Sequence, residues 1–182
     1  MGVIIWLFFM SCIAQSHFDY YRETYTYLEV YPAIVIGKPI KKADWGSPPN
    51  IRICPDTSID PARVSRAMNY WEKLGYKFGD ITMETDRYRC ISPTYHGEIT
   101  FTLPNQEFDS QRYMAMTRIT THKKTNEIVR ATIYITKKKS ERQRVLEHEI
   151  GHALGWQHYK QSRHIMNPDW DAGGYDSYGL RK

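Results

Sequence analysis

The sequence lacks internal repeats, a recognised nucleic-acid-binding motif and an apolar run long enough to cross a bilayer as a helix. We therefore expect no specific nucleic-acid partner and no stable membrane span in the mature chain. Hydrophobic residues make up 41% and charged residues 25% of the 182 residues, which is ordinary for a globular protein and argues against long disordered regions. The length fits a single domain with one site.

Charge is missing from the first residues of the chain, since residues 1–16 contain no Lys, Arg, Asp or Glu. The apolar stretch Gly2–Ala14 is too short for a membrane-spanning helix but is typical of a signal peptide, although the usual basic residue near its start is absent. Ala14 and Ser16 would allow cleavage before His17. We predict a signal peptide over residues 1–16 and a secreted or extracytoplasmic protein. A buried N-terminal strand and an uncleaved anchor are the alternatives.

Cysteine is also scarce, with three residues in the whole sequence. If Cys12 leaves with the leader, Cys54 and Cys90 remain, and an even number fits one disulfide in an oxidising compartment. Two buried free thiols are the alternative.

The formal net charge of +5 stays with the mature protein and predicts only a mild attraction to anionic surfaces. The run Lys137-Lys138-Lys139 is best explained as a solvated linker.

The remaining sequence divides into two parts. Residues 17–49 are rich in tyrosine and proline and look like an N-terminal extension without a core of its own. Residues 50–182 carry the patterns of strands and helices. Four segments read as strands from their alternation or β-type composition: 50–54, 97–103, 113–122 and 128–136. The polar turn 123–126 joins the last two, which predicts a hairpin.

Two helices are predicted from start signals, stop signals and apolar spacing. Asp60 caps the first helix, Pro61 occupies its first turn and Gly75 can end it. Its apolar face predicts packing against a sheet and consists of Val64, Ala67, Met68, Trp71 and Leu74. Ser140 begins the second helix with a capping box completed by the glutamine three residues later, and Gly155 is placed to stop it.

Three histidines and a glutamate lie in and just after the second predicted helix. His148 and His152 are four residues apart, so both imidazoles project from one face and can reach one metal ion. His158 can supply a third ligand if Gly155 adopts a left-handed conformation that bends the chain back. A catalytic zinc takes three protein ligands and leaves a position for water, and Glu149 stands where a general base is needed. A structural or degenerate zinc site is the alternative.

Residues 148–158 match the pattern HExxHxxGxxH and resemble the zinc-binding signature of the metzincin peptidases. Met166, within His164-Ile165-Met166-Asn167-Pro168, resembles the Met turn beneath the metzincin zinc, and its Met-x-Pro form is similar to the matrixin branch. The resemblance implies that Glu149 is the general acid and base, that His164 is a turn residue, and that the zinc ligands are His148, His152 and His158.

The resemblance extends loosely over residues 50–170 and implies a fold. We expect an α+β domain of the zincin type, with a twisted mixed sheet, a long backing helix and an active-site helix, so that residues 50–182 form the catalytic domain. Met166 would form an apolar floor under the ligands of one catalytic Zn²⁺. The strand before the active-site helix, residues 131–136, would be an exposed edge that pairs with an extended peptide or protein substrate.

The sequence departs from the matrixin pattern in several places. Tyr159 replaces the serine that usually follows the third histidine, and the last helix of a matrixin domain is missing or replaced by residues 171–182. Residues 54–56 fall at the end of a predicted strand and do not form a recognisable cysteine switch. Calcium has no complete ligand set, and solvated loop carboxylates are the simpler interpretation of Asp169, Asp171 and Asp176.

The sequence therefore predicts a zinc-dependent endopeptidase in which Glu149 moves the proton of a metal-activated water. One alternative from a different class is a zinc-stabilised binding or structural protein without catalysis. Another is an amidase that cleaves peptide cross-links of a cell wall, which shares the zinc chemistry and differs in its substrate.

Overall fold

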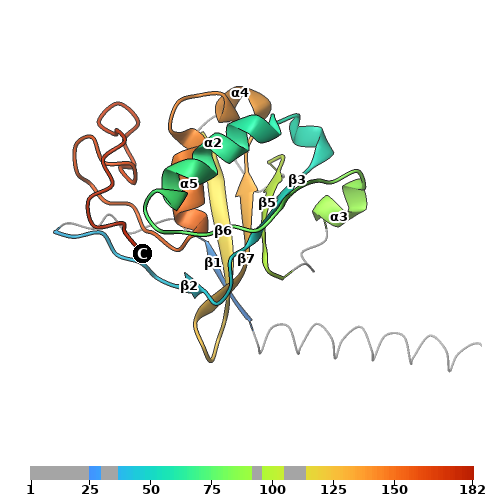
Figure 1. Cartoon of the computed structure of the whole chain (residues 1–182), viewed down its shortest axis with the longest axis horizontal. Coiled ribbons are helices and arrows are strands. Elements are labelled where there is room, and N and C mark those ends of the chain that lie inside the picture. Colours follow the sequence, from blue (N-terminus) through green and yellow to red (C-terminus); the bar gives the residue numbers. More distant parts are fainter. Residues whose placement is uncertain (1–24, 30–36, 92–95, 105–113) are drawn as a thin grey trace, which may run out of the picture.

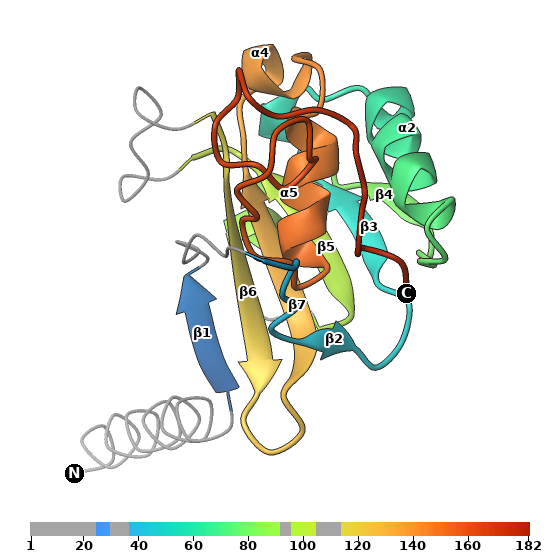
Figure 2. The same ribbon diagram turned by 90° about the vertical axis from the view of Figure 1, so that its left-hand side faces the viewer.

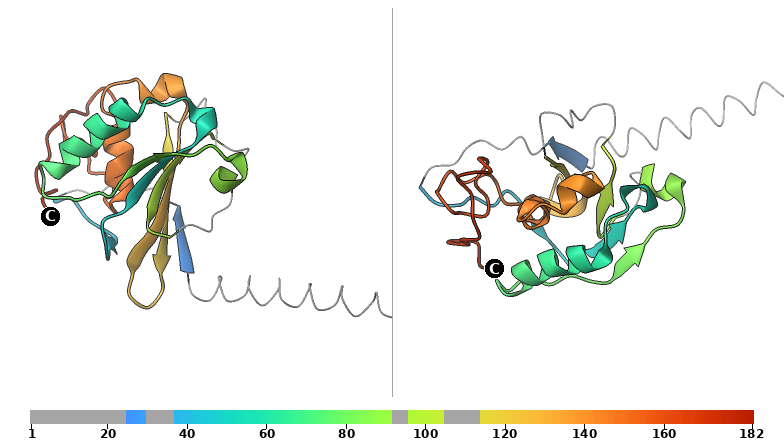
Figure 3. Two further views of the ribbon diagram at one scale, coloured as in Figure 1. Left: turned by 45° about the vertical axis from the view of Figure 1, so that its right-hand side comes forward. Right: turned by 90° about the horizontal axis from the view of Figure 1, so that it is seen from above.

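The computed structural model describes residues 25–29, 37–91, 96–104 and 114–182, which form one sheet with two helices, α2 and α5, packed on the same face (Figures 1 and 3). The elements in chain order are β1 (Tyr25–Glu29), β2 (Asp44–Trp45), β3 (Asn50–Ile53), the 3-10 helix η1 (Pro55–Thr57), α2 (Pro61–Glu72), β4 (Ile81–Met83), α3 (Arg87–Ile91), β5 (Glu98–Thr102), β6 (Met116–His122), β7 (Glu127–Tyr134), α4 (Lys137–Ser140) and α5 (Val145–Ala153).

The sheet is mixed and mostly parallel. Within the described ranges it has seven strands in the order β1-β6-β7-β5-β3-β4, with β2 paired to β7. β4, β3, β5 and β7 are parallel, whereas β6 runs antiparallel to β7 and β1 antiparallel to β6 (Figure 2). α2 supplies the crossover that two parallel neighbours, β3 and β4, require. This mixed α/β architecture is compatible with the predicted α+β class.

The predicted strands are present as β3, β5, β6 and β7, and the predicted hairpin joins β6 to β7. Asn126 ends the hairpin turn at φ 57°, a left-handed conformation that asparagine tolerates. The residues of β5 that point to the helices, Ile99 and Phe101, are apolar and fully buried. The period-two pattern of the sequence thus indicated both the strands and their buried face.

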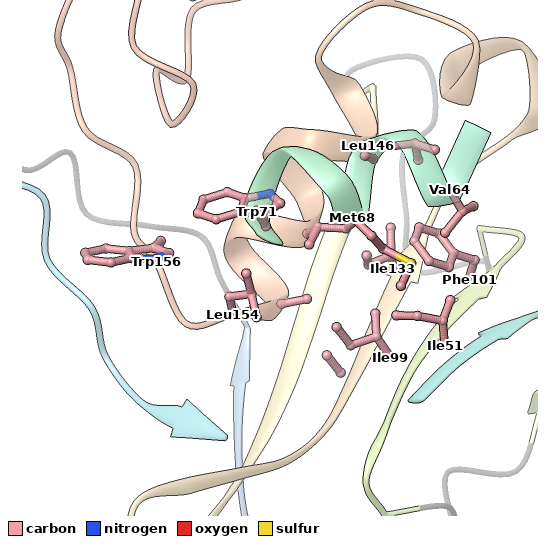
Figure 4. Close-up of a cluster of buried hydrophobic side chains, with 14 of the residues drawn as sticks. Ile51, Val64, Met68, Trp71, Ile99, Phe101, Ile133, Leu146, Leu154 and Trp156 are labelled. Atoms are coloured by element: carbon pink, nitrogen blue, oxygen red, sulfur yellow. The ribbon is translucent and has the colours of Figure 1, made fainter. Parts of the chain in front are cut away.

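α2 begins and ends where the sequence predicts. Asp60 is its N-cap and accepts a hydrogen bond from the backbone N–H of Ala62 at 2.9 Å, with Pro61 in the first turn. Gly75 follows the helix at φ +97°. Figure 4 shows Val64, Met68 and Trp71 of α2 facing a cluster of buried side chains from the sheet, α5 and the residue after α5: Ile51, Ile99, Phe101, Ile133, Leu146 and Leu154.

Residues 37–49, assigned above to the extension, share the sheet and core of residues 50–182. Ala43 is 5% exposed and belongs to the main hydrophobic core. β2 pairs in parallel with the start of β7, and the indole N–H of Trp45 donates to the carbonyl of Ala153 at 2.8 Å. Residues 37–49 are therefore packed against the helix that carries the histidines and the loop that follows it.

The predicted start of the second helix at Ser140 is wrong. Lys137–Ser140 form the short helix α4, and the Ser140 hydroxyl donates back to the carbonyl of Lys137 at 2.7 Å instead of capping the next turn. α5 begins at Val145, after Arg144 in a left-handed conformation at φ +67°. The chain changes direction between the two helices, and a capping-box pattern does not encode that turn.

The predicted edge strand is also misplaced. β7, which contains residues 131–134, lies inside the sheet because it pairs with β6 on one side and β5 on the other. The hairpin places β6 outside β7, and the parallel strand β5 covers the opposite side. β6 therefore lies between β7 and the border strand β1, which pairs with its residues Arg118–His122 in the described part of the chain.

The segment after Met166 contains no helix, as the sequence suggests. Residues 167–182 form turns that fold back over α2, and Leu180 is completely buried. The hydroxyl of Tyr76 donates to the carbonyl of Leu180 at 3.1 Å, and the N–H of Lys182 donates to the carbonyl of Leu74 at 3.1 Å. This segment covers part of the core without a further helix, in agreement with the expected departure from the matrixin pattern.

The predicted disulfide is confirmed, since Cys54 and Cys90 are bonded and join the end of β3 to α3. The predicted signal peptide, residues 1–16, and Cys12 within it lie outside the described residues. No helix in the described part of the chain is long and apolar enough to cross a membrane. The disulfide is compatible with an extracytoplasmic protein.

Replacing both Cys54 and Cys90 by alanine should destabilise the protein. The disulfide closes a loop over a sequence separation of 36 residues, and the entropy regained by the unfolded chain predicts a loss of about 4 kcal/mol in the free energy of unfolding. Urea titration measures this loss. Wild-type protein kept in reductant should show the same decrease. Equal stability of the oxidised and reduced wild-type protein would contradict the prediction.

Candidate metal centre

The three histidines predicted as ligands meet at one point. His148 and His152 lie on α5, and His158 lies on the loop that follows. The Nε2 atom of His148 is 3.0 Å from that of His152 and 3.2 Å from that of His158, and the ligand atoms of all three lie within 4.8 Å of one another. Nitrogens bound at about 2.0–2.1 Å to a tetrahedral zinc lie about 3.3 Å apart, so the cluster fits one such ion.

Backbone carbonyls orient two of the imidazoles. His148 Nδ1 is 2.7 Å from the carbonyl oxygen of Ile165, and His152 Nδ1 is 2.7 Å from that of Trp156. Each carbonyl can only accept, so each Nδ1 carries the hydrogen and each Nε2 presents a lone pair to the common point. This outer hydrogen bonding is what a metal-ligating histidine uses to fix its tautomer and ring orientation.

The protein environment keeps the imidazoles neutral. Burial lowers the pKa of His148 to about 4 and that of His158 to about 3, and it lowers the pKa of His152 well below the usual value for histidine. Metal ions bind the neutral form of imidazole, so protons compete little for these nitrogens near neutral pH.

Gly155 makes the bend that brings His158 back to α5. Its φ is +97°, and a Cβ at this position would lie 2.1 Å from the carbonyl oxygen of Ala43. The N–H of Lys42 donates to the Gly155 carbonyl at 2.9 Å, and the N–H of Gln157 donates to the Ile40 carbonyl at 3.0 Å. Glycine is therefore required both by the left-handed backbone and by the close approach of the segment before β2.

Met166 lies against α5 and is completely buried. A Cβ on Gly151 would lie 2.4 Å from the Met166 sulfur and 2.7 Å from the Trp71 ring, so a glycine at this turn of the helix admits both side chains. The N–H of Tyr159 donates to the Met166 carbonyl at 2.9 Å, which ties the turn to the residue after His158. No pattern in the sequence had pointed to the role of Gly151.

Glu149 projects from α5 toward β6 and is 6% exposed. The Thr117 hydroxyl donates to its Oε2 atom at 2.6 Å. Burial raises the pKa of Glu149 to about 7, while the hydrogen bond from Thr117 acts in the opposite direction. A carboxyl group with a pKa near neutral pH can both accept and return a proton, as a general acid and base must.

A cavity of about 200 Å³ lies beside His148, Glu149 and His158, and its other walls are formed by Met114, Ala115, Val145, Asn167, Pro168 and Trp170. The residue before α5 holds one of these walls in place. The Arg144 guanidinium lies 4.4 Å from the ring centroid of Trp170 and donates to the Trp170 carbonyl at 2.8 Å. The loop after Met166 thus reaches the centre and shapes the space next to it.

A partly buried ion pair joins α5 to α2. Arg63 of α2 makes two hydrogen bonds to the Glu147 carboxylate, at 2.7 and 3.0 Å, and Glu147 is 7% exposed. The indole N–H of Trp71 donates to the Glu147 carbonyl at 2.8 Å. These contacts set the position of α5 immediately before His148. The residues are far apart in the sequence, so no local sequence pattern could have predicted the contacts.

His164 and the nearby aspartates have structural partners. The His164 Nδ1 atom accepts from the N–H of Met166 at 3.1 Å, and its Nε2 atom is 3.1 Å from the carbonyl oxygen of Tyr178, so both ring nitrogens are engaged. Asp169 and Asp176 accept hydrogen bonds from backbone N–H groups of their own turns. In the described part of the chain, the cluster able to hold a metal comprises the three histidines.

Comparisons of the chain with models of protein families, with curated proteins and with solved structures find no match. The chemistry of the site is therefore what bears on function. Three neutral imidazoles converge, a carboxyl group with a pKa of about 7 lies beside them, and a cavity borders both. Such a set can hold a metal ion and move a proton next to it.

Gly155→Ala should disrupt the centre, whereas Gly97→Ala should not. Both glycines have positive φ, at +97° and +80°, but nothing lies within 4 Å of a Cβ on Gly97. We expect about 1–2 kcal/mol of backbone strain in each variant, with additional destabilisation and weakened metal binding in Gly155→Ala only. Urea unfolding and the metal content after dialysis measure both effects. Equal stability and equal metal content in the two variants would refute the requirement for glycine at the bend.

Proposed function

We propose that this chain is a zinc-dependent endopeptidase that hydrolyses peptide bonds in proteins. The observation that carries the proposal is the convergence of His148, His152 and His158 beside the buried carboxyl group of Glu149, at the wall of a cavity. Three protein ligands with a position left for water are the arrangement of a catalytic zinc, whereas structural zinc takes four protein ligands.

Glu149 would move the proton that hydrolysis requires. A bound zinc ion would lower the pKa of its water molecule and polarise the carbonyl group of the scissile peptide bond. Glu149 accepts a proton from the attacking water and delivers it to the leaving amine as the C–N bond breaks. The pKa of Glu149 supports this double role, because burial raises it to about 7 and brings both protonation states within reach near neutral pH.

We further propose a zincin-type fold of the matrixin-like metzincin branch. Three features support it: the backing helix α2 held to α5 by Arg63 and Glu147, the left-handed bend at Gly155, and the buried Met166 against α5. The segment after Met166 differs from the expected pattern, since it folds back without a helix. This difference concerns the walls of the cavity and leaves the three histidines and Glu149 in place.

An extended peptide is the substrate class that suits this site. Met114 and Ala115, which lead into β6, line the cavity, and Thr117 of β6 contacts Glu149. The described pairing of β1 with β6 starts at Arg118, beyond these residues. A peptide that adds to β6 before Arg118 would bring its backbone next to Glu149 and the histidines. We therefore propose that the substrate pairs with β6. The sequence had favoured residues 131–136, which include the end of β7.

We propose an extracytoplasmic location for the protein. The Cys54–Cys90 disulfide supports it, because such bonds persist in oxidising compartments. The rival interpretation, a zinc-stabilised protein without catalysis, does not account for a buried carboxyl group whose pKa is raised beside three metal-ligating side chains.

Glu149→Ala should separate metal binding from catalysis. We expect the variant to bind one zinc per chain like the wild-type protein, while kcat on a cleaved peptide falls about 100- to 10,000-fold, because the proton acceptor is lost. Glu141→Ala, at an exposed position, is the matched control and should keep its activity. Digestion of a proteome-derived peptide library identifies the substrate. Unchanged turnover in Glu149→Ala would defeat the assignment, and a zinc-loaded wild-type protein that cleaves nothing would favour the non-catalytic alternative.

His158→Ala should remove zinc as well as activity. In the wild-type protein, free zinc at 100 times its Kd should raise the free energy of unfolding by about 2.7 kcal/mol, and a chelator should reverse this effect. The variant loses one of three ligands and should show neither the stabilisation nor bound zinc after dialysis. His122→Ala, at the end of β6, is the control and should behave like the wild-type protein. Full zinc retention by His158→Ala would contradict the ligand set.

A further inference from the structure

Thr117 is the residue of the sheet that reaches Glu149. It lies near the start of β6, is 2% exposed, and its hydroxyl oxygen is 2.6 Å from the Oε2 atom of Glu149. The same oxygen is 3.2 Å from the backbone carbonyl oxygen of Glu149. Within the described residues, the Oε1 atom makes no hydrogen bond, and Glu149 lines the cavity. One carboxylate oxygen is therefore held by the sheet, and the other is left for a partner in the cavity.

The backbone and the side chain of Thr117 are both constrained. Thr117 pairs with Ile133 of β7, so its Cα position is fixed by the interior of the sheet. Its branched Cβ leaves the side chain few rotamers, and a buried position restricts them further. The hydroxyl is thus presented to Glu149 from a rigid element, as required of a group that orients a catalytic side chain.

The two acceptors near the hydroxyl have a chemical consequence. A threonine hydroxyl has one hydrogen to donate, and a hydrogen bond to an ionised carboxylate is stronger than one to a neutral carbonyl. When Glu149 is ionised, the hydrogen points to Oε2. When Glu149 holds the proton from water on Oε1, its Oε2 atom still accepts the hydrogen of the Thr117 hydroxyl. Both protonation states of Glu149 therefore keep a partner without movement of the carboxyl group.

We propose that Thr117 is a positioning residue for the general base: its hydroxyl holds Glu149 in a single orientation, with Oε1 directed to the reacting water, through the whole proton-transfer cycle. This inference rests on the proposed function and extends it to a residue outside the metal-binding motif. Thr117 touches neither metal nor substrate in this role, so it acts on the rate of reaction through Glu149 and leaves ligand binding to the histidines.

Thr117→Val tests the role because valine keeps the shape and removes the hydroxyl. We expect kcat to fall about 10- to 100-fold, the size of one hydrogen bond to a charged group, with KM, zinc content and folding unchanged. Thr117→Ser restores the hydroxyl and should recover most of kcat. Thr121→Val, at a buried threonine farther along the same strand, is the control and should keep wild-type kinetics. Wild-type kcat in Thr117→Val, or no rescue by serine, would overturn the proposal.

A second measurement keeps this role separate from the proposed peptidase activity. Crystal structures of the zinc-loaded wild-type protein and Thr117→Val would show whether Glu149 depends on the hydroxyl. We expect one carboxylate orientation in the wild-type protein and a rotated or divided one in the variant. The same single orientation in both would overturn the positioning role, whatever the activity. A wild-type protein that binds zinc but cleaves no peptide would instead refute the proposed function, and the structures would still decide the role of Thr117.

Discussion

The convergence of the three histidines depends on the close approach of the Gly155 bend to the backbone of Lys42 and Ala43. The bend returns His158 to the face of α5 that carries His148 and His152, and it is closed from outside by a segment more than a hundred residues earlier in the chain. That segment is anchored in turn, because β2 pairs with β7 and Trp45 donates to the carbonyl of Ala153. The loop that carries His158 is therefore held by the sheet as well as by its own bend.

The parts of the structure that the sequence predicts well are those encoded over short distances. Three predictions that depend on neighbouring residues are confirmed: the N-cap at Asp60, the apolar face of α2, and the alternation of buried and less buried residues in β5. The histidines converge for the same reason, since helical spacing and one glycine determine most of their geometry. The disulfide followed from a count of two remaining cysteines, which allows one pairing.

The parts that the sequence does not predict depend on contacts between distant segments. The interior position of β7 follows from its pairing with β5, and the start of α5 at Val145 follows from a turn at Arg144. The Thr117–Glu149 hydrogen bond and the close approach of Met166 to Gly151 join separate elements in the same way. Only the assembled fold brings these residues together, so no local pattern could have named them.

The pairing of β1 with β6 limits how a peptide can lie on this protein. β1 occupies the backbone groups on one side of Arg118–His122, and a strand edge offers those groups to a single neighbour. A peptide that pairs with β6 as we propose therefore has the short described stretch 114–117 beside the cavity. Recognition on that side would then rest on a short stretch of main chain, and selectivity would come mainly from the side chain that enters the cavity beside Trp170.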